Sequence, residues 1–330
     1  MKAELVKKLF VMTAATLSLV ACEDIPTVSI LSETEDFVQA ASEVNNKIDI
    51  LWVVDNSGSM GDSQTALANN FQAFINDLQN KNYDFQIAVI ATDAYRGGDY
   101  AKFKSEGGES ILNNNTPNLE NNFIENVMVG TRGSANERGL QSLETALDLE
   151  HNKNFDFPRS DAFFSVIIVS DEQDSSVEIG GSGFPGSNHY LGLLDSLRLG
   201  SALAGQKTYS VNAIVLREED GRCTSGTVGQ RYIDLVNEAN GIVASICSDF
   251  SESLTDITSS IVQLSTQFYL NREPVVESIN VVVNGEVVPR DSENGWEYVS
   301  ESNSIVFNGS AVPAQGASIL VDFDPVSLIN

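Results

Sequence analysis

The sequence has 330 residues, of which 42% are hydrophobic and 20% charged. This is the composition of a globular protein with a buried core, and it excludes a largely disordered chain. The length allows one large domain and a smaller one. Acidic residues outnumber basic ones by 46 to 19, so the formal net charge is −27. Because a field of this sign repels phosphate backbones, we expect no nucleic-acid partner.

Residues 1–21 have the pattern of a secretory signal peptide. Three lysines precede an apolar run that is too short to span a bilayer as a helix. The run ends in Leu19-Val20-Ala21-Cys22, which resembles the lipobox of bacterial lipoproteins. The resemblance implies cleavage before Cys22, lipidation of this cysteine and a protein anchored to a membrane of the bacterial cell envelope, at its periplasmic face or the cell surface. A plain secretory signal is the alternative.

Two further cysteines, Cys223 and Cys247, complete the cysteine content of the chain. In an oxidising compartment an even pair predicts a disulfide bond. Two free buried thiols are the alternative, which export from the cytoplasm disfavours.

Residues 22–46 are polar and acidic with little periodicity, which predicts a tether. Over residues 47–268, apolar runs typical of buried strands alternate with amphipathic segments typical of helices. This alternation predicts an α/β fold with a doubly wound, mostly parallel sheet and helices on both faces. Residues 95–126, rich in Gly and Asn, predict a short edge strand with long loops. We expect strands at 48–54, 85–91, 163–169, 210–216 and 242–247, and helices at 67–78, 137–149, 190–199, 229–239 and from Asp249 onwards.

From residue 273 the pattern changes to that of β-structure. Apolar residues alternate with polar ones up to Val283, and Asn284-Gly285 is a strong hairpin signal. Residues 273–330 therefore predict a small all-β domain that resembles a β-sandwich.

The polar motif Asp55-Asn56-Ser57-Gly58-Ser59 follows the first expected strand. Asp171 follows the strand expected at 163–169. Because the carboxyl ends of parallel strands meet at one edge of a sheet, these side chains are expected to lie together. Their hard oxygen atoms suit Mg²⁺, Ca²⁺ or Mn²⁺, and not zinc.

The motif resembles the metal-ion-dependent adhesion site (MIDAS) of von Willebrand factor type A (vWA) domains, over residues 47–265. Residues 130–134 and 170–176 are similar to a bacterial lipoprotein branch of this family. The resemblance implies that two hydroxyls bind the metal directly and that Asp171 acts through water. It also implies a third hydroxyl from Ser134, where the family has Thr, with Thr131 as the alternative. The implied metal site is Asp55, Ser57, Ser59, Ser134 and Asp171.

The resemblance further implies that the metal keeps an open position for an Asp or Glu carboxylate of a protein partner, which is a role in adhesion or protein–protein interaction. A structural envelope protein in which the metal only stabilises the fold is the alternative. Asp93, Glu172 and Asp174 are expected either to support a second cation or the outer shell of the site, or to be surface carboxylates. The two histidines, His151 and His189, are unrelated in the pattern, and no nucleophile elbow or P-loop is present, so we expect no enzyme.

Overall fold

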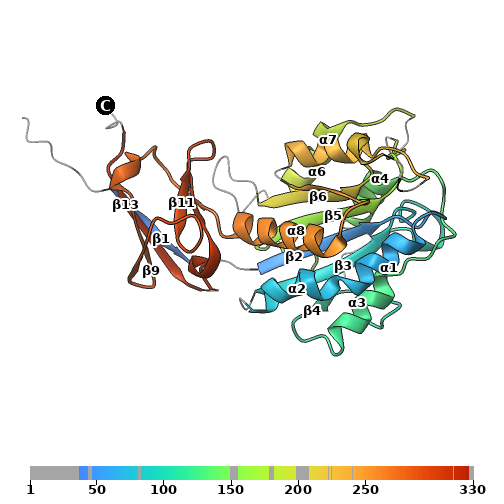
Figure 1. The fold of residues 1–330 in the computed structure, drawn as a ribbon, viewed down its shortest axis with the longest axis horizontal. Coiled ribbons are helices and arrows are strands. Elements are labelled where there is room, and N and C mark those ends of the chain that lie inside the picture. The colour runs from blue at the N-terminus through green and yellow to red at the C-terminus, as the bar shows by residue number, and fades with distance from the viewer. Residues whose placement is uncertain are drawn as a thin grey trace, which may run out of the picture. The chain divides into compact units, whose positions relative to one another are not determined.

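The computed structural model describes residues 37–43, 47–80, 83–148, 155–177, 182–197, 208–221, 223, 225–239, 241–314 and 316–326. The expected signal peptide and Cys22 lie outside these ranges. The described residues form an α/β unit, residues 47–267, and a β unit, residues 37–43 with 268–326 (Figure 1). Each unit has hydrophobic clusters of its own.

The α/β unit is built on a six-stranded sheet in the order β4-β3-β2-β5-β6-β7. All neighbours pair in parallel except β3 and β4, which are antiparallel. Counted along the chain this is the doubly wound order 3-2-1-4-5-6, as the α/β prediction requires. The strands are β2 (Lys47–Val54), β3 (Asp84–Ala91), β4 (Leu112–Asn113), β5 (Phe163–Ser170), β6 (Tyr209–Val215) and β7 (Val243–Ser245).

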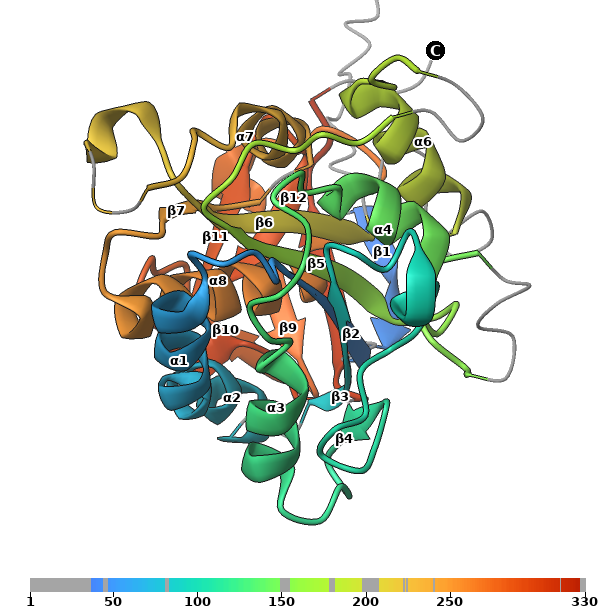
Figure 2. The same ribbon diagram turned by 90° about the vertical axis from the view of Figure 1, so that its right-hand side faces the viewer.

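Helices cover both faces of this sheet (Figures 1 and 2). On β2, Ile50 and Trp52 pack with α1, α2, α3 and α8, whereas Leu51 and Val53 pack with α4, α6 and α7. Both faces are therefore buried, which explains the long apolar runs. The helices are α1 (Gly61–Asn69), α2 (Phe71–Asn80), α3 (Leu119–Val127), α4 (Gly139–Ala146), α6 (Ser187–Ser196), α7 (Gln230–Glu238) and α8 (Phe250–Ser265). Short 3₁₀ turns are η1 (Gly97–Asp99) and η2 (Glu218–Asp220) in this unit, and η3 (Val276–Ser278) and η4 (Gly309–Ala311) in the β unit. Within the described part of the chain, none of the helices has the length and hydropathy needed to cross a membrane.

Two elements differ from the sequence-based prediction. The helix expected at 67–78 is the end of α1 followed by α2, interrupted at Asn70, whose side chain donates to the carbonyl of Ala66 at 2.8 Å. The helix α3 lies in the segment that was expected to contain loops. Its buried residues Phe123 and Val127 pack in the core, and this tertiary contact outweighs the many asparagines of the segment.

The predicted disulfide is present. Cys223 and Cys247 are bonded, with their Cα atoms 5.8 Å apart. The bond joins the loop after η2 to the segment between β7 and α8.

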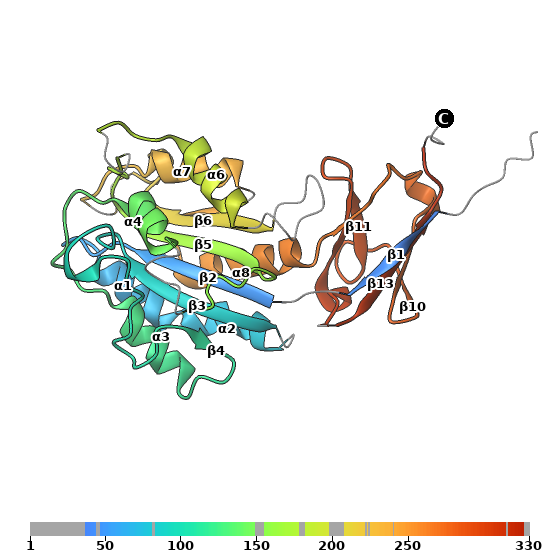
Figure 3. The same ribbon diagram turned by 180° about the vertical axis from the view of Figure 1, so that it is seen from behind.

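The β unit has two antiparallel sheets, β1-β13-β9-β10 and β11-β12-β8, with a hydrophobic core that includes Val281, Phe307 and Phe323 (Figure 3). This confirms the small all-β domain. The hairpin at Asn284-Gly285 joins β9 to β10, and both residues have positive φ, 52° and 86°, as a type I′ turn requires. The strands are β1 (Phe37–Glu43), β8 (Phe268–Tyr269), β9 (Asn280–Val283), β10 (Glu286–Val288), β11 (Trp296–Val299), β12 (Ser304–Phe307) and β13 (Ser318–Phe323).

The tether predicted at 22–46 is too long at its C-terminal end. Residues 37–43 form β1, which pairs antiparallel with β13 from Phe37↔Phe323 to Glu43↔Ser318. The β unit therefore begins before residue 273 and includes a segment that precedes the α/β unit in the sequence as well as the segment that follows it. Without β1, the backbone N–H and C=O groups along one edge of β13 would have no strand partner. β1 forms hydrogen bonds with this edge, although its own sequence has no clear alternation of apolar and polar residues.

Candidate metal site

The turn after β2 brings the first three predicted ligands together. Asp55 is fully buried, and its backbone N–H donates to the carbonyl of Val169 at 2.9 Å, which ties the ends of β2 and β5. One carboxylate oxygen of Asp55 accepts from the backbone N–H of Ser57 at 2.7 Å, a local Asx turn. The turn places the hydroxyls of Ser57 and Ser59 3.2 Å apart, so both can reach a single ion.

The neighbouring strand β5 supplies the fourth predicted ligand. Ser59 Oγ donates to Asp171 Oδ1 at 3.0 Å. Ser170 Oγ donates to the second carboxylate oxygen of Asp55 at 2.6 Å. The structure therefore brings Asp55, Ser57, Ser59 and Asp171 to one edge of the sheet, as the parallel strand order predicts.

The loop of residues 130–134 is fastened to this turn. The Gly133 N–H donates to the carbonyl of Asn56 at 2.7 Å. The buried Gln64 side chain donates to the carbonyls of both Asp55 and Gly130 at 2.8 Å. The two segments approach so closely that a Cβ on Gly133 would lie 2.1 Å from Asn56 Oδ1, so a larger residue there would displace the Asn56 side chain.

Ser134 is in this loop, but its hydrogen bonds are to residues outside the predicted metal site. Its N–H donates to Asp93 Oδ2 at 3.0 Å, and its hydroxyl accepts from the Asn136 N–H at 3.0 Å. Among the described residues, no hydrogen bond joins Ser134 to the other four predicted ligands. Thr131 lies beside Gly61, with its methyl carbon 3.6 Å from the position of a Cβ there. The third hydroxyl, Ser134 or Thr131, stays a prediction.

The three additional acidic residues, Asp93, Asp174 and Glu172, each accept a hydrogen bond from another segment around the site. Asp93 accepts from Ser134 and pairs with Arg96 at 3.0 Å. Asp174 is buried and accepts from the Leu140 N–H at the start of α4, at 3.2 Å. Glu172 accepts from Thr227 at 2.8 Å. These contacts give all three a part in positioning the loops of the site.

Glu137 is a buried carboxylate that the sequence analysis missed as a site residue. Its side chain is 1% exposed and accepts a hydrogen bond from Thr92, whereas Oε1 has no hydrogen-bond partner among the residues that the structure describes. Burial raises the pKa of Glu137 to about 8, and the charge of Asp55 contributes to this rise. Its sequence signal is weak: an acidic residue three positions after Ser134, directly before an apolar helical pattern.

The electrostatics of the site suit a cation. Burial raises the pKa of Asp55 to about 6 against the opposing hydrogen bonds of Ser170 and Ser57, and the charge of Asp171 adds to the rise. No Lys or Arg in the described ranges forms an ion pair with Asp55 or Glu137. A buried negative charge without such a partner is unfavourable, and a divalent cation would offset it.

The donor set also fits a hard cation, because it consists of carboxylate and hydroxyl oxygens. Nowhere in the described ranges do three or more His, Cys, Asp or Glu side chains form a group that could hold a metal ion. A metal at this edge would therefore depend on hydroxyls, since the cluster offers two carboxylates, Asp55 and Asp171, beside Ser57 and Ser59.

No protein-family model and no curated protein matches this sequence. Solved structures similar to parts of the chain include the proximal thread matrix protein 1 from the mussel byssus with a zinc-occupied MIDAS motif, at 15% identity over 68% of this chain and 47% of that one, with a TM-score of 0.35. The pilus adhesin SpaC from Lactobacillus rhamnosus GG shares 12% identity over 84% and 39% of the two chains, with a TM-score of 0.39. The ArnB paralog VWA2 from Sulfolobus acidocaldarius shares 12% identity over 88% and 60%, with a TM-score of 0.31. The matches thus cover less than two thirds of each of these structures.

The fold itself is defined by this chain's own elements. The sheet has the order β4-β3-β2-β5-β6-β7 with one antiparallel edge strand, and helices lie on both faces. The Asp-x-Ser-x-Ser turn follows β2, and Asp171 follows β5 beside it. The α/β unit of this protein has a vWA-like fold.

Proposed function

We propose that this protein binds a divalent cation at Asp55, Ser57, Ser59 and Asp171 and uses it to capture an Asp or Glu carboxylate of a protein partner. Mg²⁺ is the proposed ion, with Ca²⁺ and Mn²⁺ as alternatives. The observation that carries the proposal is the continuous contact from Ser57 Oγ to Ser59 Oγ to Asp171 Oδ1, at 3.2 and 3.0 Å. Hydroxyl and carboxylate oxygens converge there at the carboxyl edge of the sheet.

The residues of the site favour a partner with a negative charge. The hydroxyl ligands Ser57 and Ser59 are neutral, and both oxygens of Asp55 already accept hydrogen bonds. A cation held in this way keeps much of its positive charge and supplies an open coordination position for a carboxylate. Ser59 is exposed, so a partner can approach the site from solvent. The contact would be charge-assisted, and the surrounding loops would set its specificity.

The test uses two short blocked peptides that differ only in Asp or Asn, titrated against the protein in Mg²⁺ and in EDTA. We expect the Asp peptide to bind only with metal and the Asn peptide not to bind. Ser59→Ala should weaken metal-dependent binding by roughly tenfold or more. Because Ser59 is exposed, this variant leaves the buried core untouched. Ser196→Ala, an exposed serine of α6, is the matched control and should bind as the wild type does.

Two results would overturn the proposal. The first is peptide binding that persists in EDTA. The second is a cation that raises the melting temperature while no carboxylate ligand ever binds, which would mean that the metal only stabilises an envelope protein.

We propose a binding role and not a catalytic one. His189 Nε2 lies 3.0 Å from Glu144 Oε1 at the protein surface, and His151 is outside the described residues. Among the described residues, no histidine contacts the hydroxyls of Ser57 and Ser59 or the carboxylates of Asp55 and Asp171 to act as a base. Hydrolysis of a labelled peptide or ester panel at a rate lost in Ser59→Ala would contradict this proposal.

We also propose that lipidated Cys22 anchors the protein to a membrane of the bacterial cell envelope. The support is the sequence alone, Leu19-Val20-Ala21-Cys22 after an apolar run. Cys22→Ser should move the protein from the membrane fraction to the soluble fraction of the envelope. If the variant still sediments with membranes in high salt, the anchor is elsewhere.

A further inference from the structure

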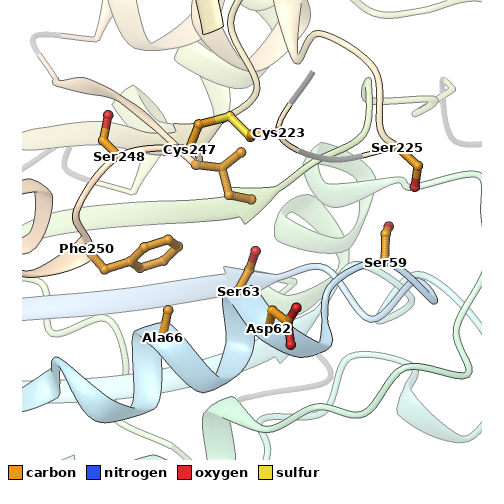
Figure 4. A pocket seen from close by; sticks show the side chains of 10 residues that line it. Ser59, Asp62, Ser63, Ala66, Cys223, Ser225, Cys247, Ser248 and Phe250 are labelled. Carbon is orange, nitrogen blue, oxygen red and sulfur yellow. A yellow bond between two sulfur atoms is a disulfide. The ribbon is translucent and has the colours of Figure 1, made fainter. Parts of the chain in front are cut away.

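A cavity of about 510 Å³ opens beside Ser59, within the range of ~300–1,000 Å³ that is usual for ligand pockets. Figure 4 shows Asp62 and Ser63 of α1 on one side and the Cys223–Cys247 disulfide on the other, with Ser59 at one end and Phe250 towards the other. The cavity therefore begins at one of the proposed metal ligands and extends away from it.

The lining of this cavity has one charged side chain. Asp62 carries a carboxylate, and the remaining lining residues contribute hydroxyls, the disulfide and apolar groups that include the Phe250 ring. Asp62 is exposed, and it forms no ion pair with any residue that the structure describes. The cavity thus combines a negative charge with an apolar wall. A Lys or Arg side chain has the matching chemistry, with a long aliphatic stem and a cationic end.

We propose that this cavity is a second subsite for the same partner and that it takes a Lys or Arg side chain close in sequence to the captured Asp or Glu. This inference rests on the proposed function, because the captured acidic residue determines which neighbouring residue of the partner lies at the cavity. Ser59 lies in the turn two residues before α1 begins, Asp62 lies in the first turn of α1, and both line the cavity. An extended partner chain advances ~3.3 Å per residue, so a residue one or two positions from the acidic one reaches the cavity.

Charge selects against other side chains at this position. An acidic neighbour would face the Asp62 carboxylate within a chain whose formal net charge is −27. Such like-charge contacts exclude wrong partners, and specific interfaces combine them with attraction of the right one. The partner segment that fits both subsites therefore has an acidic and a basic residue side by side or one position apart.

The test uses blocked hexapeptides of Gly and Ser that contain one Asp and one variable residue. The variable residue is Lys, Gln or Glu, and it is placed in turn at each of the two positions before the Asp and the two positions after it. Binding is measured in Mg²⁺ for the wild type, Asp62→Asn, Asp62→Lys and Asp156→Asn. Asp156 is an exposed carboxylate that precedes β5, so its variant changes the net charge by the same amount as Asp62→Asn without altering the cavity lining.

At one or more positions, the Lys peptide is expected to bind the wild type about threefold to fivefold tighter than the Glu peptide. This ratio should fall towards one in Asp62→Asn, reverse in Asp62→Lys and stay unchanged in Asp156→Asn. A ratio that is the same in wild type and Asp62→Lys would overturn the subsite while leaving metal-dependent capture intact. If no Asp peptide binds any variant in Mg²⁺, the proposed function itself fails, and the subsite with it.

Discussion

At the residue scale, two buried carboxylates make the metal-free site unfavourable. Burial raises the pKa of Asp55 to about 6 and that of Glu137 to about 8, well above their ordinary values. In each case the folded chain binds a proton that the unfolded chain has already released. The stability of the metal-free protein must therefore decrease as pH rises from the unfolded pKa towards the folded one. For Glu137 this window runs from about 4.5 to about 8.

Glu137→Gln tests this reasoning, because the amide has the shape of the protonated acid but cannot ionise. In EDTA at pH 7.5 the variant should raise the free energy of unfolding by about 1–3 kcal/mol, since it removes the unfavourable proton uptake. At pH 4.5 the gain should nearly vanish. Urea denaturation at the two pH values measures it.

The control for this variant is Glu125→Gln on the exposed side of α3, which should change stability little at either pH. Glu137→Gln should also weaken cation binding, because one negative charge near Asp55 is lost. A stability gain of equal size at both pH values would show that Glu137 is not protonated in the folded metal-free protein.

At the scale of single elements, β2 is held at both ends by polar contacts. Its carboxyl end carries the metal site, whereas near its amino end the fully buried Asp49 pairs with Arg159 at 2.7 Å. The same guanidinium group pairs with Asp84 of β3 at 2.8 Å and donates to the Asp84 carbonyl. One arginine thus joins two neighbouring strands at the edge opposite the site.

Asp49→Ala should lower the free energy of unfolding by about 3–5 kcal/mol, because it leaves the buried Arg159 charge without its main partner. Cation affinity should change less than twofold, since the pair lies at the other end of the strand. Asp161→Ala is the comparison: its contact with Lys47 is half-exposed and should contribute less than about 1 kcal/mol. Equal effects of the two variants in guanidinium denaturation would contradict the role given to the buried pair.

The sequence predicted the sheet well because strands buried on both faces have long apolar runs. The same rule gave no sign of the role of Asp49, which lies within such a run and pairs with Arg159, 110 positions away in the chain. Helix α3 and the interruption at Asn70 depend on tertiary contacts and one side-chain hydrogen bond, which local patterns do not contain. For the site, Asp55, Ser57, Ser59 and Asp171 could be placed from strand ends. Glu137 could not, because its position depends on how a loop folds.

At the scale of the whole molecule, the β unit is assembled from distant parts of the chain. β1 precedes the α/β unit in sequence, β8 to β13 follow it, and β1 pairs with β13. Because the two strands are far apart in the sequence, no local sequence pattern indicates that they pair. It explains why residues 37–43 were predicted as part of a tether.

Deleting residues 37–43 should destabilise the β unit and leave cation affinity unchanged, because β13 loses one of its two strand partners. The two tryptophans allow a direct measurement, since Trp296 is buried in the β unit and Trp52 in the α/β unit. In a Trp52→Phe background, the thermal transition of Trp296 fluorescence should shift to lower temperature. Deleting residues 26–32, also seven residues, is the control, and an equal shift there would contradict the role of β1.

The central claim is that oxygens from two strand ends share one divalent cation, and crystals grown with Mn²⁺ and measured for anomalous scattering test it most directly. The expected result is an anomalous peak about 2.1 Å from the hydroxyls of Ser57 and Ser59, beside Asp55 and Asp171, that disappears in Ser59→Ala. A peak bound elsewhere, or no peak at saturating Mn²⁺ with these four side chains ordered, would contradict the claim.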